Sequence, residues 1–302
     1  MRGRFSSAII GIAALVLASV APRPTLAGSM TYIALGDSVA FGETDFAHNP
    51  SYGDRGYVSL YANSLAASNG GVRPNVVNLG VDGETSTSFL SGGQAAAPQN
   101  LNYSSSSTSQ NTLLVSQLAA AQASGNTIGA VTVSLGANDL FAVVNQANFF
   151  SMSPAQQQSA LLGSMSTVQN NYTALLTEIH ALAPHAAVSL VGYYNPYPAV
   201  PGSPVTPLAG PAIQLLNAVI AGQAAAFGAK YIDTYTPIMG HEAQLTHITD
   251  KPAGLNVHPN DAGYAAIANA INPVPEPSTI VLLGVFGAGL IGRAAYRRRQ
   301  AA

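Results

Sequence analysis

Apolar and polar positions in the middle of the chain follow two alternating patterns. Short, nearly continuous apolar runs rich in β-branched residues cover residues 31–35, 76–79, 130–135, 187–193 and 231–232. Such runs predict strands that are buried on both faces. Longer stretches with helical spacing of apolar residues lie between or after them, at 57–67, 113–123, 155–182, 212–227 and 259–271. The alternation predicts one α/β domain with a mainly parallel, five-stranded sheet covered by helices on both faces.

The last predicted helix shows the helical pattern most clearly. Four apolar residues are spaced as i, i+3, i+4 and i+7, namely Tyr264, Ile267, Ala268 and Ile271. Pro259 suits the first turn of this helix, so we expect His258 just outside its N-terminus. Residues 84–112 and 195–211 are rich in Ser, Gln, Asn, Gly and Pro, which predicts loops over the carboxyl ends of the strands.

The N-terminal end differs from this pattern. Arg2 and Arg4 precede an apolar run over residues 8–20, which is short for a membrane span and is followed by small residues up to Ala27. A basic start, a short apolar core and small residues are typical of a signal peptide. We expect residues 1–27 to be removed by signal peptidase, with a cut after Ala21 as the competing site.

The C-terminal end has three parts. The motif Pro275-Glu276-Pro277 precedes an apolar run over residues 280–291, and four arginines follow, at positions 293, 297, 298 and 299. About twelve apolar residues are marginal as a permanent membrane span, so this segment favours transient membrane docking.

Charge and composition exclude several function classes. The middle span, residues 28–272, holds four basic and twelve acidic side chains, a formal charge of −8, although the whole chain carries −2. This acidity argues against a nucleic-acid partner. The chain has no cysteine, which excludes disulfides and thiolate nucleophiles. His241, Glu242 and His247 lack the spacing of a known zinc motif, so we expect no metal and no other cofactor.

Residues suited to catalysis follow the predicted strands. Ser38 follows the first strand, Gly80 the second and Asn138 the third, while His258 precedes the last helix. The carboxyl ends of strands in an open parallel sheet are where such folds place their sites. A hydroxyl becomes nucleophilic when a neighbouring imidazole takes its proton, so Ser38 and His258 form a candidate pair.

Taken in order, Ser38, Gly80, Asn138 and His258 resemble the signature of the SGNH hydrolases, also called GDSL esterases and lipases, over nearly all of residues 30–271. The resemblance implies a flavodoxin-like three-layer α/β/α sandwich, the SGNH hydrolase fold, over residues 28–272. It also implies that Ser38 is the nucleophile and His258 its general base. The N–H of Gly80 and the side chain of Asn138 would join the N–H of Ser38 in an oxyanion hole.

One position departs from the family pattern. Members usually carry Asp three residues before the His, and Leu255 stands there instead. Asp250, the side chain of Asn256 or a backbone carbonyl of this loop would have to orient the imidazole. Of these, we favour Asp250 or a backbone carbonyl.

The last thirty residues, 273–302, resemble the PEP-CTERM sorting signal. That resemblance implies recognition and removal by an exosortase in a Gram-negative bacterium that makes exopolysaccharide. We therefore expect the protein to be exported to the periplasm, outer surface or extracellular matrix, with transient anchoring in the inner membrane.

These features together predict an exported esterase or lipase that hydrolyses a small-molecule, lipid or polysaccharide ester through an acyl-Ser38 intermediate. Two alternatives remain. The departure at Leu255 and the sorting signal fit a noncatalytic surface protein that binds polysaccharide in a degenerate SGNH site. The setting of such sorting signals also fits an esterase that removes acetyl groups from extracellular polysaccharide.

Overall fold

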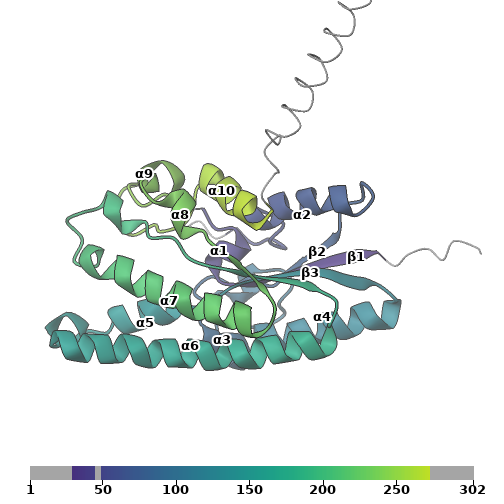
Figure 1. Cartoon of the computed structure of the whole chain (residues 1–302), viewed down its shortest axis with the longest axis horizontal. Coiled ribbons are helices and arrows are strands. Elements are labelled where there is room, and N and C mark those ends of the chain that lie inside the picture. The colour runs from purple at the N-terminus through teal and green to yellow at the C-terminus, as the bar shows by residue number, and fades with distance from the viewer. Residues whose placement is uncertain (1–28, 45–48, 273–302) are drawn as a thin grey trace, which may run out of the picture.

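The computed structural model describes residues 29–44 and 49–272 (Figure 1). The expected signal peptide and sorting signal, residues 1–27 and 273–302, lie outside these described residues. Five parallel strands form one sheet in the order β2-β1-β3-β4-β5. They are β1 (Met30–Gly36), β2 (Asn75–Asn78), β3 (Thr127–Ser134), β4 (Ala187–Val191) and β5 (Lys230–Ile232). The predicted α/β fold and strand number are therefore confirmed.

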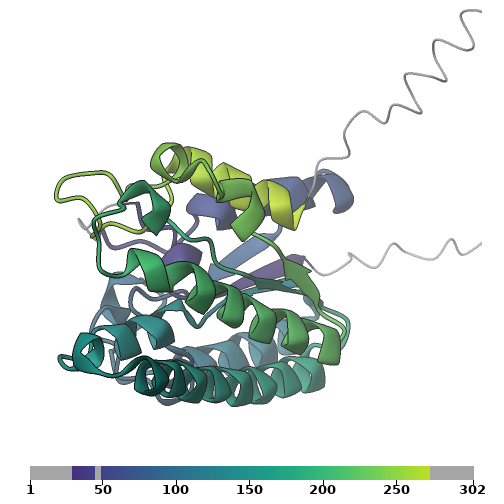
Figure 2. The same cartoon turned by 60° about the vertical axis from the view of Figure 1, so that its left-hand side comes forward.

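Helices cover both faces of this sheet (Figures 1 and 2). The α-helices are α1 (Ser38–Phe41), α2 (Gly56–Ser68), α3 (Ser86–Ser91), α4 (Gln110–Ser124), α5 (Ala137–Val144), α6 (Pro154–Leu182), α7 (Thr206–Ala226), α8 (Tyr235–Ile238), α9 (Glu242–Leu245) and α10 (Asp261–Ile271). Three short 3-10 helices are η1 (Ala97–Gln99), η2 (Phe149–Ser151) and η3 (Tyr197–Ala199). Helices α2 and α10 pack on one face, and α4, α6 and α7 pack on the other.

Strand β1 shows how the sequence divides the core between these two faces. Ile33 and Leu35 point into the apolar cluster that includes α4, α6 and α7, whereas Tyr32 and Ala34 point into the cluster with α2 and α10. All four side chains are fully buried, as expected for a central strand whose side chains alternate between two covered faces.

Several helices differ from the predicted ones. Helix α10 begins at Asp261 rather than in the turn of Pro259, because the Asn260 side chain accepts a hydrogen bond from Gly263 N at 3.0 Å and caps it there. Helix α7 begins at Thr206, with a proline in its first turn and Pro211 further along. Helix α3 lies within the predicted loop 84–112.

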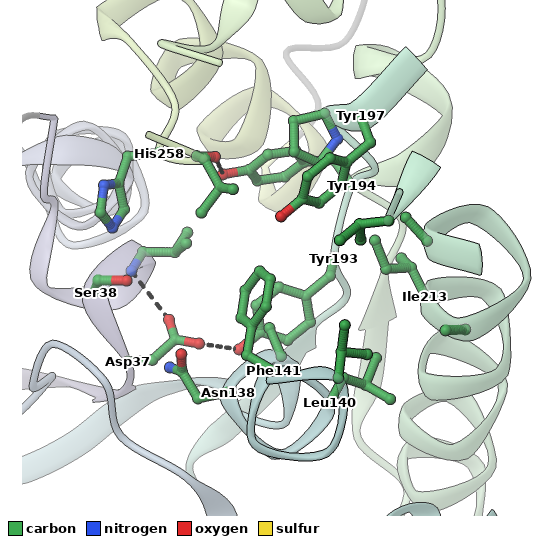
Figure 3. A pocket seen from close by; sticks show the side chains of 18 of the residues that line it. Asp37, Ser38, Asn138, Leu140, Phe141, Tyr193, Tyr194, Tyr197, Ile213 and His258 are labelled. Carbon is green, nitrogen blue, oxygen red and sulfur yellow. Dashed lines mark hydrogen bonds between the residues drawn. The ribbon is translucent and has the colours of Figure 1, made fainter. Parts of the chain in front are cut away.

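Helix α7 is apolar because it packs in the core. This helix is long and apolar enough to cross a membrane by length and composition alone. Its buried side chains, Leu216 and Ile220 among them, pack instead against the sheet and α6. The first turns of α7 and the segment after β4 stand near the carboxyl end of the sheet, where Ser38 also lies (Figure 3).

Candidate active site

Ser38 directly follows the tight turn between β1 and α1. The backbone at Gly36 has a φ of 140°, and a side chain there would collide with the carbonyl of Ser134, so the turn requires glycine. Asp37 caps α1, since its Oδ1 accepts from Val39 N at 3.0 Å. Ser38 is thereby held at the first position of the helix, and its side chain borders a cavity. Within the described residues, the N–H of Ser38 makes no hydrogen bond.

His258 borders the same cavity, two residues before Asn260, the N-cap of α10 (Figure 3). Its Nδ1 lies 2.9 Å from Asn256 Oδ1, which also accepts from the His258 backbone N–H at 3.2 Å. The Asn256 amide nitrogen donates to Thr44 O at 3.0 Å, which fixes the amide with its oxygen toward the imidazole. Because that oxygen only accepts, Nδ1 carries the hydrogen and Nε2 is left to take a proton.

Asp250 does not lie against His258. Its carboxylate pairs with His247 Nδ1 at 2.8 Å, and its side chain is 61% exposed. The expectation that Asp250 orients His258 is therefore corrected by the structure, in which the buried Asn256 makes that contact. Leu255, at the usual Asp position, is 62% exposed.

Asn138 lies in the first turn of α5 and lines the cavity beside Ser38. One hydrogen of its side-chain amide is donated to the carbonyl of Glu84 at 3.0 Å, which leaves the second for another acceptor. The neighbouring Asp139 holds this segment, since its carboxylate accepts from Ser86 N at 2.8 Å and from Ser86 Oγ at 2.7 Å. The orientation of Asn138 is thus set by a buried network.

Gly80 does not face the cavity, which corrects its expected place in an oxyanion hole. Its N–H donates to Asn78 Oδ1 at 2.8 Å. A Cβ at this position would lie 2.7 Å from Phe41 N, so the glycine permits close packing of the β2 end against α1. The Gly80 N–H is therefore not available to a substrate, because the Asn78 side chain two residues earlier already accepts its hydrogen.

Gly83 is the second glycine after β2 and offers another backbone N–H for an oxyanion hole. It follows Asp82, which lines the cavity, and precedes Glu84, whose carbonyl accepts from Asn138. Its φ is 74°, and in the described part of the chain its N–H has no hydrogen-bond acceptor. Two glycines three residues apart look alike in the sequence. Only the hydrogen bonds distinguish them.

Burial raises the pKa of three carboxyl groups around the site, those of Asp37, Glu84 and Asp139. Burial raises the pKa of Asp37 to about 7, although the hydrogen bond from the Tyr193 hydroxyl, at 2.5 Å, acts in the opposite direction. Burial also raises the pKa of Glu84 to about 7, against hydrogen bonds from Ser88 and Gln110. Clustered perturbed groups beside a cavity are typical of functional sites.

The cavity itself has a volume of about 200 Å³ and is walled mostly by apolar side chains. Figure 3 shows the polar group of Asp37, Ser38, Asn138 and His258 on one side of it. Side chains from α5, α7 and the segment after β4 lie on the other side, among them Leu140, Phe141, Tyr193, Tyr194 and Ile213. Ser38 therefore lies where the polar side chains border the apolar part of the cavity.

Comparison with protein-family models shows the family of this chain. Residues 34–266 match the GDSL-like lipase/acylhydrolase family. The chain belongs to this family. Residues 273–299 also match the PEP-CTERM protein-sorting motif, which indicates an exported, exosortase-sorted cell-surface protein. A comparison with curated proteins found no match.

Solved structures of two lipases and of an acetyl xylan esterase share the fold. A lipase from a goat rumen metagenome is similar with a TM-score of 0.55 and 19% identity, over 80% of this chain and 96% of its own. An extracellular lipase from Streptomyces rimosus gives 0.54 and 22%, over 81% and 99%. An acetyl xylan esterase variant from Geobacillus stearothermophilus gives 0.50 and 19%, over 81% and 94%. At these identities the likeness establishes the SGNH fold of this GDSL-like chain.

Proposed function

We propose that the chain is an exported, active serine esterase that hydrolyses carboxylic esters through an acyl-Ser38 intermediate. The observation that carries the proposal is the meeting of Ser38, His258 and Asn138 around one cavity. Three donors in this region have hydrogens to spare among the described residues, and we assign them to the oxyanion hole: the N–H of Ser38, the N–H of Gly83 and the second amide hydrogen of Asn138.

Acylation uses these groups in order. Ser38 Oγ attacks the ester carbonyl carbon while its proton passes to His258 Nε2. The negative charge that develops on the carbonyl oxygen accepts hydrogen bonds from the three donors. When the bond to the leaving oxygen breaks, His258 gives the proton to that oxygen and an alcohol departs.

Deacylation repeats these steps with water. His258 takes a proton from a water molecule, whose oxygen attacks the acyl carbon, and the donors again stabilise the oxyanion. The bond to Ser38 Oγ then breaks, and His258 returns the proton to that oxygen. A carboxylic acid leaves and the enzyme is restored.

Asn256 takes over one part of the role that the Asp usually has in the family, the orientation of the imidazole. Its amide oxygen lies 2.9 Å from Nδ1 and holds the imidazole in the tautomer that carries its hydrogen on Nδ1. It carries no charge, so it orients the ring without the electrostatic stabilisation of an imidazolium by a carboxylate. Among the hydrogen bonds of the described residues, none joins Ser38 to His258, and free enzymes commonly close such a contact only around substrate.

Export places this chemistry outside the cytoplasm. The matched sorting motif at residues 273–299 supports processing by an exosortase, and the basic, apolar start of the chain supports signal-peptide cleavage after Ala27. The mature hydrolase would occupy residues 28–272. Its destination would be the periplasm, the outer surface or the extracellular matrix, after transient docking in the inner membrane.

Covalent labelling tests the proposal directly. The full chain, purified in detergent, is treated with a fluorophosphonate, and the modified residue is located by mass spectrometry. We expect modification of Ser38 in the unchanged protein and a strong loss of labelling in His258→Ala, with Ser38→Ala unlabelled and inactive but folded. A folded, unlabelled protein would overturn the proposal and favour a noncatalytic binding protein.

A further inference from the structure

We infer that the site prefers esters of medium-length acyl chains, about six to ten carbons long, and that the small side chains of Ala209 and Ala212 on α7 leave room for a chain of this length. This inference rests on the proposed function, because it assigns the acyl group of the same Ser38 ester to the adjoining cavity. It concerns which acyl group is transferred. The alcohol that leaves is a separate matter.

The walls of the cavity are the first step of the argument. Leu140 and Phe141 come from α5, and Leu208, Ala209 and Ala212 come from one side of α7. None of these side chains offers a hydrogen-bonding group, whereas a pocket for a sugar or a charged acyl group needs such groups at its surface. The wall chemistry matches a hydrocarbon chain.

Two of the three tyrosines that line the cavity, Tyr193 and Tyr194, do not change this character. The Tyr193 hydroxyl donates to Asp37 at 2.5 Å, and the Tyr194 hydroxyl donates to the carbonyl of Val257 at 2.7 Å. With both donors already used, these two residues offer the cavity mainly the carbon atoms of their rings (Figure 3). Tyr193 and Tyr194 therefore favour an acyl group over a sugar as the occupant of the cavity.

The size of the cavity gives the chain length. Its volume is about 200 Å³. An apolar cavity of about 150 Å³ holds benzene, a six-carbon molecule, so this one holds a chain of roughly eight carbons. An acetyl group would leave most of this apolar space unfilled, and a chain of sixteen carbons would extend beyond it.

Two small side chains keep this space open. Ala209 and Ala212 are buried on the cavity side of α7, at 6% and 8% exposure. At helical spacing of three residues they lie side by side, and a larger apolar residue at either position would project into the cavity. Ala218 on the same helix is exposed and offers a matched control position.

The experiment compares p-nitrophenyl esters of acetate, butyrate, octanoate and palmitate, which share one leaving group. Each methylene group that becomes buried contributes up to about fourfold in kcat/KM. We expect a maximum at octanoate, at least tenfold above acetate. Ala209→Leu and Ala212→Leu should each lower the octanoate-to-acetate ratio at least tenfold, while Ala218→Leu should leave the ratio within twofold of the unchanged protein. A maximum at acetate or palmitate would overturn the inference.

A binding measurement separates this inference from the proposed function. The probe is 2-decanone, which has no ester bond to cleave, and the readout is the melting temperature of the Ser38→Ala protein. We expect a rise with 2-decanone that Ala212→Leu abolishes and Ala218→Leu retains. Absence of Ser38-dependent hydrolysis of every ester would overturn the proposed function. No rise in melting temperature, or a rise that survives in Ala212→Leu, would overturn the assignment of the cavity.

Discussion

The imidazole of His258 is held by an amide, because Asn256 Oδ1 lies 2.9 Å from His258 Nδ1. The same amide is fixed from its other end by the carbonyl of Thr44, at 3.0 Å. Orientation of the ring and stabilisation of its charged form are therefore separable here, since a neutral acceptor provides the first with little of the second.

Substitution of Asn256 tests this separation. Asn256→Ala should lower kcat at least tenfold with little change in KM, equivalent to about 1.4 kcal/mol of barrier, because the ring loses its orienting acceptor. Asn256→Asp should restore orientation and add a charge that favours the imidazolium. The pKa of His258 would rise, and the acid limb of the kcat/KM profile would move to higher pH.

Asp250→Ala is the matched control for this prediction. Asp250 pairs with His247 and not with His258, so its removal should leave kcat and the pH profile within about twofold of the unchanged protein. A large loss of kcat in Asp250→Ala, with none in Asn256→Ala, would contradict the positioning role of Asn256.

Removal of the Asn138 amide should slow the chemical step. Asn138→Ala deletes one of the three proposed oxyanion donors, and single donors of this kind typically contribute a factor of about 10² to 10³ in kcat. The folded state should be little affected, since Asn138 is half-buried. Steady-state kinetics with the exposed Asn148→Ala as control measures this. An unchanged kcat in Asn138→Ala would show that the amide does not contact the reacting oxygen.

The two glycines after β2 should respond differently to alanine. Gly80→Ala brings a Cβ to 2.7 Å from Phe41 N and should destabilise the fold by about 1 to 3 kcal/mol, as overpacking does. Gly83→Ala meets its nearest atom only at 3.6 Å, so the strain of a positive φ, about 1 to 2 kcal/mol, is its main penalty. Urea unfolding compares them, and a larger loss in Gly83→Ala than in Gly80→Ala would argue against the assigned packing.

The fold was predictable because its signals are local and repeated. Tyr32, Ile33, Ala34 and Leu35 form a continuous apolar run, and their burial on two faces follows directly from it. The start of α7 was not predictable in this way. Pro207 and Pro211 indicate a loop in the sequence, yet Pro207 occupies a first turn, where its missing N–H needs no partner.

The site was predictable in its residue types and less so in its contacts. Asp250 and Asn256 lie eight and two residues before His258, and the sequence alone does not say which turns toward the ring. That choice depends on the loop path and on Thr44, more than two hundred residues away in the chain. Gly80 and Gly83 pose the same problem, because the side chain of Asn78 decides which N–H is free.

Stability should depend on pH through Asp37. In the unfolded chain this carboxyl ionises near pH 3.8, and in the folded protein burial raises its pKa to about 7. Between these values the folded state holds a proton that the unfolded state has lost. The free energy of unfolding therefore falls as pH rises from about 4 to 7, by up to roughly 4 kcal/mol from this group, and then levels off.

Asp37→Asn removes this titration while its amide still reaches Val39 N and Tyr193. The difference in unfolding free energy between the unchanged protein and Asp37→Asn should therefore vary across this pH range. Urea unfolding at pH 4.5, 6 and 7.5 measures it. Parallel stability curves would contradict the raised pKa of Asp37.

Tyr193 joins two parts of the site that could otherwise vary independently. Its ring forms part of the cavity wall, and its hydroxyl supports Asp37, the residue that caps the nucleophile helix. Its backbone is clamped by Asn217, which accepts from Tyr193 N and donates to Tyr193 O, both at 2.7 Å. A substitution that widens the chamber at Tyr193 would also disturb Ser38. Evolution or engineering of new acyl specificities is therefore channelled to the neighbouring wall positions on α7, such as Ala209 and Ala212, which do not contact Asp37 through a hydrogen bond.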